Sequence, residues 1–280
     1  MRSIVLATLM LMVALPVDLA YADKAHEHYL RGIGLRRSNA YKQAAHEFRQ
    51  AIRLRPNYLA ARLGLAHTLR RMRDWAGAGT QYERVVKGSP KNGNAWHLLG
   101  VCRYRQKQYT AAIQAFRRAG RLSPKDYEVW RDLATAYRMQ KNLKGAAAAM
   151  QKAVNLRAND PENWSKLGVY LSLLKRHAQA LKAHNRALKL ASSNANYLFN
   201  AAVAYRRDGK RARALQLYKQ AIARNPRLEA AYFDLGVLYQ AKQDKALAIQ
   251  HFLTYLRLAG HRLSANERKS VQGRINRLQR

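Results

Sequence analysis

A 34-residue period runs through most of the chain without an insertion. Its clearest marker is an alanine that recurs at this spacing, namely Ala44, Ala78, Ala112, Ala146, Ala180, Ala214 and Ala248. A second position, twelve residues earlier in each unit, always holds Gly or Ala. Small residues at fixed places indicate pairs of helices packed so closely that only Gly or Ala fits where they cross. The period therefore predicts an all-α solenoid, a fold that offers an extended binding surface rather than an enclosed active-site pocket.

The other positions of the period complete a helix–turn–helix unit. The segments Trp96–Tyr104 and Ala111–Pro124 carry it best, with a Trp and a Leu-Gly pair in the first helix, then Ala, Phe and Ala in the second helix and a closing Pro. This pattern resembles the tetratricopeptide repeat family. The resemblance implies a right-handed superhelical solenoid, and it implies little about function because the family is a scaffold with many uses.

Seven units follow from the period. They span residues 25–58, 59–92, 93–126, 127–160, 161–194, 195–228 and 229–262, within a repeat domain of residues 23–262. The basic tail of residues 263–280 carries Val271, Ile275 and Leu278 at helical spacing. We interpret this tail as a capping helix that covers the end of the seventh unit.

The N-terminus has the pattern of a secretory signal. Arg2 precedes an apolar run over residues 4–15, Pro16 breaks the run, and Ala20 and Ala22 give the small residues of a cleavage site. We expect a signal peptide over residues 1–22 and a mature chain that begins at Asp23 in a bacterial periplasm. An uncleaved anchor helix is the alternative, which the short apolar run argues against.

The balance of charges is strongly basic. The chain has 52 Lys and Arg residues against 16 Asp and Glu residues, a formal net charge of +36. Such a field attracts anionic partners, mainly through contact-range clusters because physiological salt screens charges beyond about 8 Å. Solubility or an acidic environment is the alternative explanation. The chain has no nucleic-acid motif and its basic residues spread over all seven units, so nucleic acid is a poor candidate.

The resemblance implies a concave groove lined by the first helix of each repeat. At the late positions of these helices stand Arg36, Arg37, Arg70, Arg71, Arg105, Arg138, Arg206 and Arg207. Arginine can hold a carboxylate or a phosphate in bidentate fashion, so we expect these residues to form an anion-binding edge. The alternative is that cations simply favour the C-terminal end of a helix through its dipole.

The last two repeats carry a different predicted lining. It consists of Phe199, Asn200, Val203, Phe233 and Val237. An aromatic floor with one amide resembles family members that bind extended peptides, in which the asparagine holds the ligand backbone. Packing of both phenylalanines against a second helix is the alternative.

Two histidines are expected on adjacent first helices, at His67 and His97. The simplest interpretation is a pair of solvated histidines. A pH-responsive pair and a metal site are alternatives, although no further ligand lies nearby in the sequence. Cys102 is the only cysteine, and its position holds small residues in other repeats, so we expect it to be buried.

No motif of an enzyme is present. The chain has no glycine-rich phosphate loop, HExxH, GxSxG or paired-carboxylate site. The sequence therefore predicts a non-catalytic scaffold, without a cofactor, that holds an acidic or extended segment of a partner protein within an envelope assembly. Direct binding of an anionic polymer, such as an acidic polysaccharide or the head groups of a membrane surface, is the alternative function.

Overall fold

A computed structural model describes the backbone of residues 17–280 and the side chains from residue 23 onward. The predicted signal peptide therefore lies mostly outside the described residues, and its cleavage stays a prediction. Its last residues belong to helix α1, which begins at Val17. None of the described helices has both the length and the hydrophobicity needed to cross a membrane.

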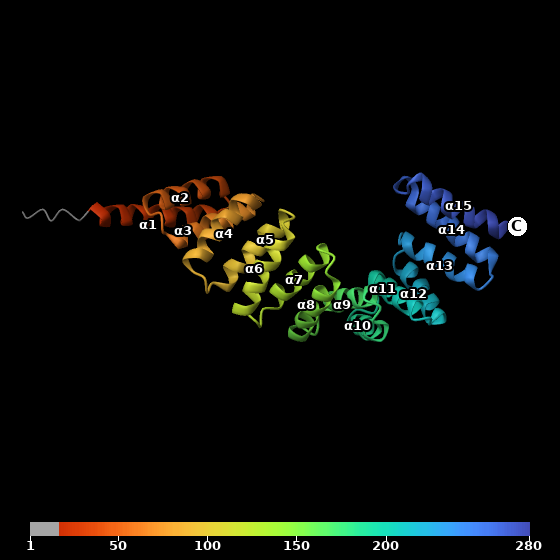
Figure 1. The fold of residues 1–280 in the computed structure, drawn as a ribbon. Helices are drawn as coiled ribbons and strands as arrows, with labels where there is room; N and C mark the ends of the chain where they lie inside the picture. Colours follow the sequence, from red (N-terminus) through yellow and green to blue (C-terminus); the bar gives the residue numbers. More distant parts are fainter. Residues whose placement is uncertain (1–16) are drawn as a thin grey trace, which may run out of the picture. The chain divides into compact units, whose positions relative to one another are not determined.

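Helices follow one another in consecutive packed pairs (Figure 1). The pairs are α1 (Val17–Arg37) with α2 (Tyr41–Leu54), α3 (Leu59–Arg71) with α4 (Trp75–Gly88), α5 (Gly93–Arg105) with α6 (Tyr109–Leu122), α7 (Tyr127–Met139) with α8 (Leu143–Leu156), α9 (Pro161–Leu173) with α10 (His177–Leu190), α11 (Ala195–Arg207) with α12 (Arg211–Arg224), and α13 (Glu229–Ala241) with α14 (Lys245–Ala259). Each pair ends within the unit that the 34-residue period predicts. The described residues contain no strand, so the predicted all-α solenoid is confirmed.

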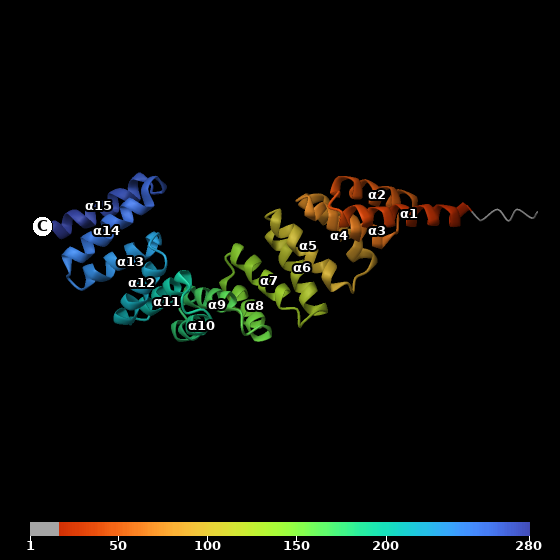
Figure 2. The ribbon, with the colours of Figure 1, turned by 180° about the vertical axis from the view of Figure 1, so that it is seen from behind.

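The chain forms two compact units. The first runs to Pro124 and contains α1 to α6, and the second covers Lys125–Arg280 and contains α7 to α15. Within each unit, the first helix of every repeat packs against its own second helix, and that second helix packs against the first helix of the next repeat. Seen from behind, the same succession of pairs is visible (Figure 2). We refer below to the first and second helix of a repeat as helix A and helix B.

The recurrent small residues lie where helix A and helix B touch. All seven marker alanines on helix B are fully buried. Where helix A has glycine, a side chain from helix B lies directly over it: a Cβ on Gly32 would meet Phe48 at 2.8 Å, and a Cβ on Gly100 would meet Phe116 at 2.6 Å. These distances are too short for any real Cβ, so the glycine permits the close contact of the helices.

The residues in this contact alternate as pairs. Glycine on helix A faces Phe or His on helix B, as in Gly236 with Phe252, whereas alanine occurs in the repeats whose helix B has Tyr or Met, as with Ala134 and Met150. The tyrosine hydroxyls form hydrogen bonds at the edge of the contact: Tyr82 pairs with His67, and Tyr218 donates to Asp234. Alanine adds one methyl group to helix A compared with glycine. A tyrosine ring held by its hydroxyl, or a flexible methionine side chain, leaves room on helix B for this methyl group.

The turn from helix A to helix B contains a left-handed residue in every repeat. These residues are Asn39, Arg73, Lys107, Lys141, Lys175, Gly209 and Gln243, with φ between 59° and 79°. Only Gly209 is a residue for which this conformation carries no steric cost. Four of the others are basic, which suits the negative end of the helix dipole.

The chain ends in a helix that closes the second unit. A short 3₁₀ turn (Gly260–Arg262) leads into α15 (Ala265–Gln279), and Ser264 and Glu267 form a capping box at its start. Val271 and Ile275 are buried in the apolar cluster of the last repeats, and Leu278 packs against it. The structure thus places a helix at the predicted capping segment.

We expect Gly100→Ala to destabilise the first unit, because its Cβ would collide with the buried Phe116 ring. Overpacking of this kind costs about 1–3 kcal/mol. Adding Phe116→Met to Gly100→Ala gives the Ala–Met pair of the fourth repeat. In a double-mutant cycle, the double variant should be about 1 kcal/mol more stable than the sum of the two single changes predicts. Chemical denaturation measures both effects.

The matched control is Gly34→Ala, on exposed α1 backbone where a Cβ would meet no atom within 4 Å. It should stabilise the protein by about 0.5–1 kcal/mol, the usual advantage of alanine over glycine in a helix. Equal destabilisation by both alanines would contradict the packing account.

Candidate functional site

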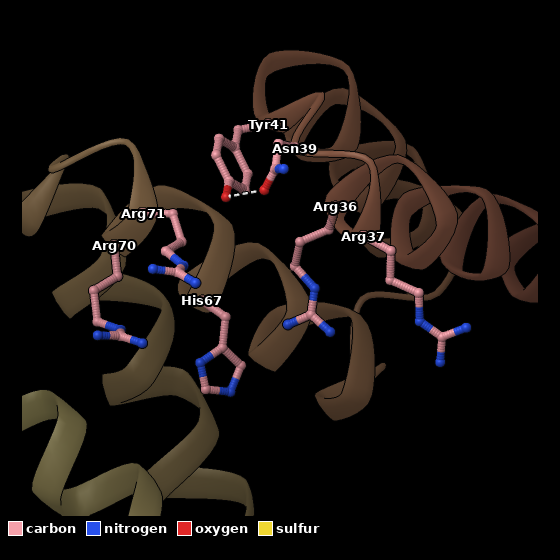
Figure 3. A pocket seen from close by; sticks show the side chains of 7 residues that line it. All are labelled: Arg36, Arg37, Asn39, Tyr41, His67, Arg70 and Arg71. Carbon is pink, nitrogen blue, oxygen red and sulfur yellow. Dashed lines mark hydrogen bonds between the residues drawn. The ribbon is translucent and has the colours of Figure 1, made fainter.

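A cationic pocket opens in the first unit, where α1 and α3 end. It is lined by Arg36, Arg37, Asn39, Tyr41, His67, Arg70 and Arg71 and has a volume of about 420 Å³. Arg36, Arg70 and Arg71 lie around His67, and Arg37 lies at the margin (Figure 3). Two of the predicted arginine pairs are thus brought together in one place, which we call the arginine pocket.

The arginine pocket contains no carboxylate. Within the described residues, none of its four arginines forms an ion pair, whereas Arg31 in the same unit pairs with Glu47 at 3.4 Å. Arg36 and Arg70 are half-buried, and the Nε atom of Arg70 is buried without a hydrogen-bond acceptor among those residues. Cations held close together without a counter-charge repel one another, so an anion entering the pocket would be stabilised.

His67 forms the floor of the pocket. Its Nδ1 atom lies 3.0 Å from the Tyr82 hydroxyl, and the two rings meet edge to face. Burial is the main cause that lowers the pKa of His67 to about 4, and the charges of Arg36 and Arg70 contribute in the same direction. His67 is therefore neutral at pH 7 and adds no charge to the four arginines.

The rim is fixed by the turn between α1 and α2. Asn39 is the left-handed residue of this turn, and its Oδ1 atom accepts a hydrogen bond of 2.5 Å from the Tyr41 hydroxyl. The bond holds the Tyr41 side chain at the edge of the pocket (Figure 3). Among the lining residues, Asn39 and Tyr41 are the ones that the sequence pattern did not indicate.

The remaining predicted arginines have other surroundings. Arg105 lies over the Trp75 ring at 5.5 Å, and Arg138 donates to the sulfur of Met139. Arg206 forms an ion pair with Asp234 at 3.5 Å and a hydrogen bond to the Tyr218 hydroxyl, while Arg207 is exposed. Arg206 is therefore partly neutralised within the chain.

The repeat register explains why Arg206 is paired and Arg70 is not. The two arginines occupy the same position in their repeats. The residue 28 positions later is Asp234 for Arg206 but Leu98 for Arg70, and it is Gly64 for Arg36. The same backbone place thus supports an internal ion pair in the second unit and unpaired cations in the first.

The predicted aromatic lining packs inward. Phe199 contacts Tyr218 with ring centroids 5.7 Å apart, and Phe233 contacts Phe252 and Tyr255 at 5.9 and 5.2 Å. All three partner rings belong to B helices, and both phenylalanines stay half-buried.

The polar and aliphatic members of this lining also have partners within the second unit. Asn200 donates to the Ser165 hydroxyl at 3.2 Å. Val203 and Val237 pack against the apolar cluster. The prediction of ligand contact at these positions stays untested.

The histidines are not the solvated pair that the sequence suggested. His97 is only 8% exposed and packs against Phe116, and His67 is half-buried on Tyr82. That expectation was wrong because His97 occupies the same repeat position as Phe199 and Phe233, and His67 the same position as Val203 and Val237. Both places face helix B, so the imidazoles pack there as rings.

Cys102 is fully buried, as expected, and burial raises the pKa of its thiol to about 11. The described side chains contain no group of three or more His, Cys, Asp or Glu residues that could hold a metal ion.

Comparison with known proteins identifies the family. A family model described as tetratricopeptide repeat matches residues 63–127 and 199–262, and a second model of the same description matches residues 103–168. The chain therefore belongs to the tetratricopeptide repeat family. A comparison with curated proteins finds no match.

Several solved structures share the fold. The C-terminal part of a tetratricopeptide repeat protein from Cytophaga hutchinsonii is 16% identical, with a TM-score of 0.70 over 86% of this chain and 98% of that chain. YrrB, described as a TPR protein with an unusual peptide-binding site, is 22% identical, with a TM-score of 0.60 over 71% and 99%. Pseudomonas aeruginosa pilF is 19% identical, with a TM-score of 0.56 over 81% and 99%. At these identities the likeness shows the fold alone.

The lowered pKa of His67 predicts a specific dependence of stability on pH. Unfolded His67 takes up a proton near its ordinary pKa of 6.5, whereas the folded side chain stays neutral down to about pH 4. Its contribution to stability is therefore complete above pH 6.5 and is lost as the pH falls toward 4. His67→Val, which introduces the residue of several other repeats, should flatten this part of the profile relative to the unmodified chain. Denaturation midpoints measured between these pH values check it; parallel profiles for the two proteins would contradict the assignment.

Proposed function

We propose that this protein is a non-catalytic interaction scaffold that holds an acidic segment of a partner protein, with the arginine pocket as its anchor. The family supports the general role, since tetratricopeptide repeat proteins are interaction scaffolds. The observation that carries the proposal is the meeting of four arginines from α1 and α3 without any carboxylate.

The chemistry of the pocket favours carboxylates of a peptide. Arginine offers a planar fork of donors that matches a carboxylate in bidentate fashion. Arg36 and Arg70 are half-buried, so part of the cost of ordering these long side chains is already met by the fold. Arg37 and Arg71 are exposed, and their charges can steer an acidic segment toward the pocket.

Direct binding of an anionic polymer is the second candidate function. The net charge of +36, spread over all repeats, favours it, because a polyanion can be held by many dispersed cations. Such binding would weaken steeply with salt and would depend little on any one cluster of arginines. This difference separates the two functions.

We further propose that the scaffold acts in a bacterial envelope assembly after export. The support is the signal-like pattern of residues 1–22. YrrB, which is similar in fold, is described as having a peptide-binding site, and a peptide ligand for this chain is consistent with that property of YrrB.

The double change Arg36→Ala with Arg70→Ala is expected to weaken the binding of a labelled glutamate-rich peptide by about tenfold to a hundredfold. The reason is that a hydrogen bond to a charged group is worth about 1.5–3 kcal/mol. Fluorescence anisotropy at several salt concentrations measures the affinity and its salt dependence. The fold should persist, because neither arginine pairs with a described carboxylate.

The matched control is Arg49→Ala with Arg53→Ala, which removes the same charge from exposed positions on α2. This control should change the affinity only slightly. If both pairs weaken peptide binding equally, general charge attraction is responsible, and the anionic-polymer function is the better account.

Export is checked on the protein isolated from its own cells. Mass spectrometry should find a chain that begins at Asp23, so that α1 keeps only the residues from 23 to 37. A native chain that retains Met1, or that is found in the cytoplasm, would remove the envelope from the proposal without affecting the arginine pocket.

A further inference from the structure

A second concavity lies in the second unit, on the face formed by α8, α9 and α10. It has a volume of about 770 Å³. Its lining is Lys144, Ala147, Ala148 and Gln151 of α8, Trp164, Leu167 and Leu171 of α9, and Arg176, Gln179, Lys182, Ala183 and Arg186 at the start and along the face of α10. We call it the α8–α10 groove; the arginine pocket shares no residue with it.

The α9 side of the groove is open at a position that varies among the repeats, with leucine also at Leu35 and Leu69 and arginine at Arg103. Leu171 stands where three other repeats have a tyrosine, namely Tyr137, Tyr205 and Tyr239. On α11, the Tyr205 hydroxyl donates to Asn185 of the B helix α10. On α13, the Tyr239 ring stacks on His251 of the B helix α14. A tyrosine at this place spans toward a B helix, whereas Leu171 is too short to do so.

Helix α8 deepens the same groove. Ala147 stands where three repeats have Ile113, Leu215 and Ile249, whereas the first two repeats also have a small residue there, Ala45 and Gly79. Ala148 stands where the same three repeats have glutamine. Smaller side chains on both α8 and α9 therefore leave room for the groove, while the backbone of the repeat is kept.

The lining combines an apolar floor with basic walls. Trp164 contributes an indole whose Nε1 atom already donates to the carbonyl of Ala158, so its ring is available for apolar contact. Both walls carry cations, with Lys144 on α8 and Arg186 on α10 among them, and no lining residue is acidic. A complementary ligand has an apolar stripe with negative charge on each side of it.

We propose that the α8–α10 groove binds an amphipathic helix of a partner protein whose apolar stripe is flanked by acidic side chains. The small residues Ala147, Ala148 and Ala183 on the facing helices let the backbone of a third helix approach closely. Helices α8 and α10 have 14 residues each, which gives the groove a length of about 20 Å or some four helical turns.

Charge disfavours a second copy of the chain as the occupant. At a net charge of +36, two copies repel each other, and the walls of the groove would face further cations. A lipid carries its negative charge at one end, whereas the cations of the groove stand along both walls. An acidic helix fits this distribution better than either.

The experiment uses the full chain and a synthetic peptide of about 18 residues, long enough to populate a helix. The peptide carries leucine at helical spacing and glutamate on both flanks, and a scrambled peptide of equal composition is the reference. We expect the helical peptide to bind at least about tenfold more tightly than the scrambled one, because only the former presents a continuous apolar stripe.

The deciding variant is Leu171→Tyr with Ala148→Gln, which gives the groove the residues of the sibling repeats. Because those repeats fold with the same residues, the variant should keep its helical circular dichroism, and peptide affinity should fall by about tenfold or more. Arg176→Glu with Arg186→Glu should weaken binding further through repulsion of the glutamates. Arg49→Ala with Arg53→Ala, at exposed positions of α2 that line neither site, is the control and should leave binding of this peptide nearly unchanged.

Three results would overturn the proposal. The first is that the filled variant, Leu171→Tyr with Ala148→Gln, binds the helical peptide as tightly as the unmodified chain does. The second is that the scrambled peptide binds as tightly as the helical one. The third is binding of phosphatidylglycerol vesicles in preference to the peptide, with the loss of that binding in the filled variant, which would assign the groove to a lipid. The variants of the α8–α10 groove share no residue with those of the arginine pocket. A failure of one proposal can therefore be distinguished from a failure of the other.

Discussion

The contact between a helix B side chain and the backbone of helix A within each repeat is the constraint on which the rest of the structure depends. Phe116 lies so close to Gly100 that a single methyl group would not fit between them. Where the glycine is replaced by alanine, the helix B residue changes with it to Tyr or Met. The paired change keeps the distance between the helices, so the backbone of each repeat stays the same while its surface is free to differ. Both candidate sites lie on such surface differences.

Much of the fold follows from residues whose spacing is a direct record of packing. The marker alanines predict the helix pairs, and Val271 and Ile275 predict the last helix, because burial on one face leaves a period in the sequence. The left-handed turns leave no such record. Lys107 and Lys141 adopt this conformation although their residue type does not favour it, and of the seven residues only Gly209 and Asn39 are of types that signal it. The surrounding helices impose the turn, so the local sequence carries little trace of it.

The candidate sites were predictable only in part, because a side chain's role depends on its neighbour in the next repeat. The Arg36 and Arg70 pairs were identified from their position, and the structure brings them together. That Arg206 is paired depends on Asp234 in the following repeat. Comparison of equivalent residues reveals it, and the same comparison shows that Leu171 lacks the tyrosine ring that three other repeats have at this position. The packing of His97 is hidden for a similar reason, because it shows only when His97 is aligned with Phe199 of a later repeat.

The distribution of the few acidic residues therefore has more influence on recognition than the large number of basic ones. Cations are abundant in every repeat and most of them are solvated, so their number alone selects no ligand. Asp234 partly neutralises Arg206, and Glu47 partly neutralises Arg31, because each pair forms an ion pair. Where the equivalent place holds Leu98 or Gly64, the arginines keep their full charge on a half-buried surface. A specific anion site can thus arise in a uniformly basic solenoid from the absence of one carboxylate, at a place that the repeat has already shaped.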